Sequence, residues 1–172
     1  MPRLLSTKVI LYFCFLLLLD WIFAAPLRDG FFQPVFLYLI ALYAGFAGDW
    51  RQAFRFAFTA GFLRDALSTQ PMGVETVVLL AAALSLSFFV KKIERRSSVM
   101  RIFIGFIFVF GVSLFVLVFS NLLGFAQQPL WQCLTLAVST AGSTVVFLPL
   151  FFFLTAWWFR EKEMLRQYEL FR

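Results

Sequence analysis

The chain has 172 residues, of which 62% are hydrophobic and 14% charged, whereas a typical soluble domain has about 45–50% and about 25%. This composition excludes an ordinary water-soluble globule, and because a membrane-spanning helix needs about 20 mostly apolar residues, six of them would occupy ~120 residues and leave no room for a soluble domain. The net charge of +6 indicates topology rather than nucleic-acid binding, since in a membrane protein the location of basic residues matters more than their sum.

Six apolar runs, separated by short polar segments, predict an all-α integral membrane protein with a single polytopic domain. The third run is the weakest prediction, because it contains Arg55, Arg64 and Asp65. Pro34 is expected to open the second helix, and Pro149 to kink the last one. After the last run, residues 160–172 are expected to form an amphipathic cytoplasmic tail. It either lies on the inner leaflet, binds a cytoplasmic partner, or extends the last helix. The expected helices cover residues 9–25, 34–48, 52–67, 73–90, 102–125 and 130–159.

The distribution of basic residues predicts that both termini are cytoplasmic. If all six runs cross the membrane, only Arg28 and Arg64 of the 15 basic residues fall on the outside, as the positive-inside rule expects. If the third run did not cross, the cluster between Lys91 and Arg101 and the C-terminal tail would face outward. The distribution of basic residues therefore favours a membrane crossing by the third run, whereas hydropathy alone does not decide whether this run crosses.

One face of the third run consists of small residues that end in a carboxylate. Ala53, Ala57, Gly61 and Asp65 are spaced four apart, and small side chains let two helices approach closely in a membrane. We expect this face to pack against another helix, within the chain or in a partner.

A second group of candidate residues lies near the predicted outer ends of the helices, and we call it the outer polar cluster. Carboxylates within the bilayer are costly and usually have a partner. This cluster could hold helices together or form a ligand vestibule, while Asp65 by itself could simply hydrogen-bond across the turn that follows it. Its members are Asp20, Asp29, Arg64, Asp65 and Glu75.

No catalytic constellation is recognisable in the sequence. The chain has no histidine, which removes the commonest general base and metal ligand, and it has no Walker loop or GxSxG motif. We therefore expect no catalytic residues, no metal site and no cofactor.

The segment from Pro34 to Gly73 resembles the MreD family of bacterial rod-shape proteins. That family has a proline at the start of its second helix, a tyrosine nine residues later, then a glycine, an aspartate four residues on and a second glycine. Pro34, Tyr43, Gly61, Asp65 and Gly73 match these positions without a gap. The chain length and the number of expected helices also agree.

The resemblance implies a non-enzymatic scaffold of the cell-elongation machinery in the bacterial inner membrane. It implies binding to MreC and, through MreC, to MreB filaments and to the RodA glycosyltransferase with its transpeptidase. No nucleic-acid partner is expected, because topology accounts for the basic residues. The resemblance also implies a fold similar to the S-components of energy-coupling-factor transporters. The alternative is a small-molecule-binding subunit of a membrane transporter, with the outer polar cluster as its site.

Overall fold

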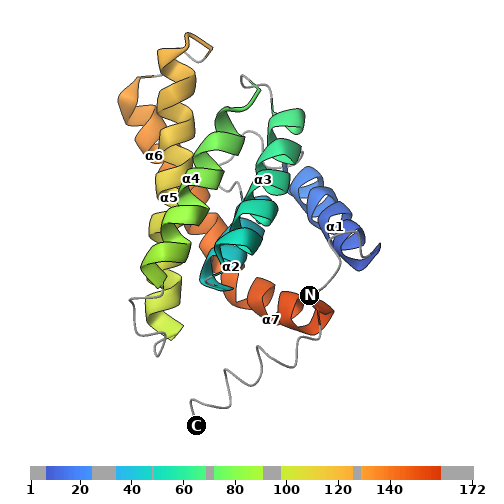
Figure 1. Ribbon diagram of the computed structural model, residues 1–172. Helices are drawn as coiled ribbons and strands as arrows, with labels where there is room; N and C mark the ends of the chain where they lie inside the picture. Colours follow the sequence, from blue (N-terminus) through green and yellow to red (C-terminus); the bar gives the residue numbers. More distant parts are fainter. Residues whose placement is uncertain are drawn as a thin grey trace.

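The computed structural model describes residues 7–24, 34–47, 49–68, 72–90, 98–125 and 129–159. Within these ranges every regular element is a helix and none is a strand, and the helices gather into one bundle (Figure 1). The helices are α1 (Thr7–Ala24), α2 (Phe36–Ala47), α3 (Trp50–Leu67), α4 (Val74–Val90), α5 (Ser98–Leu122), α6 (Leu130–Val146) and α7 (Leu148–Phe159). The expected tail lies outside the described residues.

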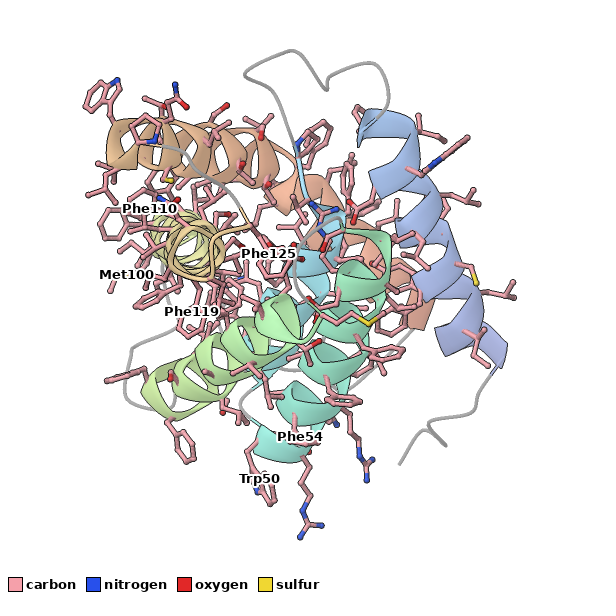
Figure 2. All side chains as sticks on the ribbon, turned by 90° about the horizontal axis from the view of Figure 1, so that it is seen from above. Trp50, Phe54, Met100, Phe110, Phe119 and Phe125 are labelled. Carbon is pink, nitrogen blue, oxygen red and sulfur yellow. The ribbon has the colours of Figure 1, made fainter. Side chains whose placement is uncertain are left out.

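Helix α2 is the central element of the bundle. The side chains from Val35 to Leu42 are all buried, because neighbouring helices cover α2 on every side. Such a helix, apolar all round, is typical of the centre of a bundle. Helices α3 and α4 pack on it as an antiparallel pair, α5 packs against α4, and α6 packs against α5 (Figure 2).

Several helix starts differ from the sequence-based expectation: α1 begins at Thr7 rather than at residue 9, and α5 at Ser98 rather than at residue 102. Helix α3 begins at Trp50 rather than at residue 52, because the Asp49 side chain accepts a hydrogen bond from the Arg51 N–H (3.1 Å) and so acts as the N-cap. Helix α2 begins at Phe36, two residues after Pro34.

The helix expected over residues 130–159 is broken into two. Helices α6 and α7 meet at Phe147 with a bend of 47°. Pro149 is the physical reason, because it has no N–H and its ring would collide with the carbonyl of residue 145 in a continuous helix. The bend turns α7 toward α1 (Figure 1), where the Tyr12 hydroxyl lies 2.5 Å from Oγ1 of Thr155.

Helix length and composition identify fewer membrane spans than the six expected. Within the described residues, Met100–Leu122 is long and apolar enough to cross a membrane, and the bent α6–α7 pair is a second if it forms one broken span. Shorter apolar helices lie in α1, α2 and α4. At 1.5 Å per residue, the 12 residues of α2 cover only about 18 Å of a hydrocarbon core of about 30 Å.

Candidate functional site

The carboxylate of Asp65 caps the helix that follows its own. Gly73 occupies the N-cap position of α4, with φ +97°, and its carbonyl accepts the first helical hydrogen bond, from the Val77 N–H (3.0 Å). A glycine has no side chain to accept from the next N–H groups, which a helix start leaves unpaired. Oδ1 of Asp65 accepts from the Glu75 N–H and Oδ2 from the Thr76 N–H, both at 3.0 Å, and Oδ2 also accepts from the Thr76 hydroxyl.

The carboxylate of Asp20 likewise caps the N-terminus of α2. The N-cap residue Val35 has an apolar side chain, and Oδ1 of Asp20 accepts a hydrogen bond from the Phe36 N–H (2.6 Å). The N–H of Val35 itself donates to Oγ1 of Thr144 in α6 (3.0 Å). The start of α2 is therefore held by side chains from two other helices.

The positions of these two aspartates in their own helices have the same explanation. Asp65 lies in the last turn of α3, and Asp20 lies just before the last turn of α1, four residues from its end at Ala24. The helix dipole disfavours a negative charge near this end of a helix. Each side chain reaches instead to the N-terminus of the next helix, where the dipole favours a carboxylate and where capping stabilises a helix by about 1 kcal/mol. The α1–α2 and α3–α4 pairs thus use the same contact.

Arg64 lies beside Asp65 and links the two capped helix starts. Its Nε is 3.2 Å from Oε2 of Glu75, whose side chain is only 3% exposed. The guanidinium also donates a hydrogen bond to the hydroxyl of Tyr38 in α2, and Asp20 is close enough to Arg64 to interact electrostatically. One cation thereby compensates carboxylates from α1 and α4.

The residues that hold these two helix starts, together with their partners, form what we call the capping cluster. The cluster acts as a structural joint between the four helices α1 to α4. The side chains are buried, apart from a partly exposed Arg64, and each carboxylate pairs with a helix start or with the guanidinium. In the described part of the chain, no group of three or more His, Cys, Asp or Glu residues is arranged to hold a metal ion. The cluster consists of Asp20, Tyr38, Arg64, Asp65, Glu75 and Thr76.

The structure brings together four members of the outer polar cluster, namely Asp20, Arg64, Asp65 and Glu75. The fifth, Asp29, lies outside the described residues. Sequence reasoning did not identify Tyr38 or Thr76 as members of the site. A signal for Tyr38 was present, since a phenol within a long apolar run needs a hydrogen-bond partner when it is buried.

The small-residue face of α3 lies inside the chain. Ala53, Ala57, Gly61 and Asp65 are all buried, and a Cβ on Gly61 would lie 2.5 Å from Cα of Thr76. This distance is far inside van der Waals contact, so the absence of a side chain allows the backbones of α3 and α4 to approach. In this arrangement the face packs against the chain's own helices and is closed to a partner.

The five residues that match the family pattern have separate structural roles. Pro34 is buried just before the N-cap of α2, and the ring of Tyr43 contacts that of Phe152 in α7, with centroids 5.5 Å apart. Gly61 permits the α3–α4 approach, Asp65 caps α4, and Gly73 adopts a positive φ that L side chains rarely adopt. Three of the five thus serve the junction between α3 and α4.

Comparison with known proteins gives one match. The model of the family described as rod shape-determining protein MreD matches residues 1–157. No curated protein and no solved structure matches the chain. The expected likeness to the transporter S-component fold therefore stays a prediction.

Proposed function

This chain belongs to the MreD family of rod shape-determining proteins, and from that membership we propose that it is a non-enzymatic scaffold of the cell-elongation machinery. Proteins of this family are membrane proteins. The observation that best supports a scaffold is the contrast between the interior and the surface: the buried carboxylates hold helices together, whereas the outer faces present large apolar side chains. Such a surface offers lateral contacts to lipid and to other helices.

The topology that we propose has six crossings of the inner membrane and cytoplasmic termini. Helices α1 to α5 each cross once, and α6 with α7 forms one broken crossing. This topology is supported by the positive-inside distribution of basic residues and by the apolar composition of α1, α2 and α4. The low apolar content of α3 fits a helix whose Arg64 and Asp65 are engaged with α4 rather than with lipid.

For MreC, the partner that the family suggests, we propose the outer face of α1 as the contact surface. The small-residue face of α3 is buried within the chain, so the partner must bind elsewhere. Leu11, Phe15, Leu18 and Ile22 of α1 are exposed, and their spacings of four, three and four residues are those of helices that pack side by side. A single-span partner helix could lie along this row.

Copurification of MreC tests this surface. We expect the triple variant L11A/F15A/L18A to recover about tenfold less MreC, because three large contacts are removed from one face. The matched control is F103A/I107A/F115A, which truncates three exposed residues on α5. Equal recovery with both folded variants would contradict the proposal.

The native cysteines provide an independent measurement. Cys14 is exposed on α1, whereas Cys133 is buried. A thiol crosslinker should therefore join this chain to a cysteine introduced in the membrane span of MreC through Cys14, and C14S should abolish the product. A crosslink that survives C14S would place the partner on another helix.

A small-molecule-binding subunit of a transporter is the second candidate, and one observation favours it. Oδ2 of Asp20 is buried without a hydrogen-bond partner among the described residues, and a ligand donor could satisfy it. A panel of vitamins would be screened for a thermal shift that is lost in D20N. The absence of any shift with folded protein would exclude this candidate for the compounds in the panel.

A further inference from the structure

Helix α3 presents an aromatic ridge on the face opposite to its buried side. Phe54, Phe58 and Phe62 are 42%, 46% and 59% exposed. Their rings stack in sequence, with centroids 6.1 Å and 6.4 Å apart and nearly parallel planes. Trp50 continues the same four-residue spacing at the start of the helix, and Figure 2 shows Trp50 and Phe54 on the outer edge of α3, away from the other helices.

Two arginines stand at the Trp50 end of this ridge. Arg51 and Arg55 are exposed, and the guanidinium of Arg51 lies over the Trp50 ring, 5.5 Å from its centroid. Neither guanidinium has an acidic partner within the described ranges; the nearby Asp49 side chain accepts from the backbone of Arg51 instead. Helical side chains lean toward the N-terminus, so Arg55 is directed toward the level of Arg51.

This arrangement matches the shape of an amphiphile. Phe54 and Phe62 are eight residues apart, about 12 Å along a helix, which is close to the ~15 Å depth of one leaflet's hydrocarbon. An anionic phospholipid of the same leaflet places its phosphate beside the arginines and its acyl chains along the rings. A partner helix on this face would need to bring acidic groups to two unpaired cations at the end of an apolar row.

We propose that the outer face of α3, comprising Trp50, Arg51, Phe54, Arg55, Phe58 and Phe62, is a binding site for an anionic phospholipid. Each basic residue near an anionic surface favours an anionic lipid by about fivefold. The site goes beyond the scaffold function, because it requires only the chain and a bilayer. It also gives the least apolar helix of the bundle a lipid-facing surface suited to its charges.

Fluorescence quenching by brominated lipids measures this binding directly. A chain that keeps only Trp50, with the other four tryptophans changed to Phe, is reconstituted into vesicles containing equal amounts of phosphatidylglycerol and phosphatidylcholine. Only one of the two lipids is brominated in each preparation. Because two arginines contribute, we expect brominated phosphatidylglycerol to report an enrichment of at least about fivefold around Trp50.

A chain that keeps only Trp131 is the matched reference, because this tryptophan is 73% exposed on α6. Its expected ratio between the two brominated lipids is near one. R51Q/R55Q in the Trp50 chain should bring the ratio to that of Trp131, and the comparison within one variant cancels any change in the intrinsic emission of Trp50. K162Q/R166Q removes the same amount of charge from the tail and should leave the enrichment in place.

Three outcomes would overturn the proposal. The first is an equal ratio at Trp50 and Trp131, and the second is an enrichment that survives R51Q/R55Q. The third is loss of quenching by both lipids when a partner protein is reconstituted with the chain, which would assign this face to the protein. Since no outcome depends on cell shape or on MreC recovery, failure of the lipid site and failure of the scaffold function are distinguishable.

Discussion

Gly61 and Thr76 bring α3 and α4 into backbone contact, since a Cβ on Gly61 would lie 2.5 Å from Cα of Thr76. The same Thr76 donates two hydrogen bonds to Asp65, which lies one turn after Gly61 in α3. Close approach and capping are therefore interdependent: the aspartate reaches the start of α4 because the glycine lets the helices meet.

Gly61→Ala is expected to destabilise the protein by about 1–3 kcal/mol, because the added methyl would push apart two backbones that cannot shift independently. The free energy of unfolding would be measured by titration with SDS in mixed micelles. Gly111→Ala is the matched control, since a Cβ there meets nothing within 4 Å; it should be neutral or stabilising by up to about 1 kcal/mol, through helix propensity. Equal effects of the two substitutions would contradict the proposed contact.

Asp65→Ala leaves the N–H groups of Glu75 and Thr76 without their acceptor and should cost about 1–3 kcal/mol. Asp49→Ala removes the exposed cap of α3, where water can replace the side chain, and should cost less, about 1 kcal/mol. Hydrogen exchange at the first turn of α4 would distinguish loss of the α4 cap from loss of the α3 cap, because only Asp65→Ala should accelerate exchange there. Unchanged exchange there would argue against capping by Asp65.

Arg64 and Glu75 should be energetically coupled. Removing one partner leaves the other charge without compensation, whereas removing both is milder. In a double-mutant cycle with Arg64→Gln and Glu75→Gln, the double variant should be more stable than the sum of the single effects predicts, by about 1–2 kcal/mol. Additivity of the two substitutions would show that the 3.2 Å ion pair contributes nothing.

The variants Asp20→Leu and Asp20→Asn should differ in their free energy of unfolding. The asparagine keeps an oxygen that can accept from the Phe36 N–H, and so it should retain most of the stability, whereas leucine should lose about 1–2 kcal/mol. Thr144→Val removes the acceptor of the Val35 N–H and tests the second contact at the start of α2. Identical unfolding free energies for the leucine and asparagine variants would contradict the role of Asp20 in capping.

The sequence by itself determined the fold class and the family. Apolar runs of helical length can satisfy their backbone hydrogen bonds only locally in a membrane, so composition alone favours a helical protein. The pattern from Pro34 to Gly73 was specific enough to identify the MreD family, and the family model confirms this identification. The spacing of Ala53, Ala57 and Gly61 indicated a packing face, because residues four apart share one side of a helix.

Only the tertiary structure decided what these residues contact. The sequence places Asp20 sixteen residues before Phe36 and Asp65 eleven before Thr76, and helical periodicity does not extend across the intervening turns. It could not show that each aspartate caps the following helix, nor that the small-residue face is closed by the chain's own helices. These contacts depend on how closely two helix axes approach, and that distance is set by all the side chains between them rather than by any local pattern.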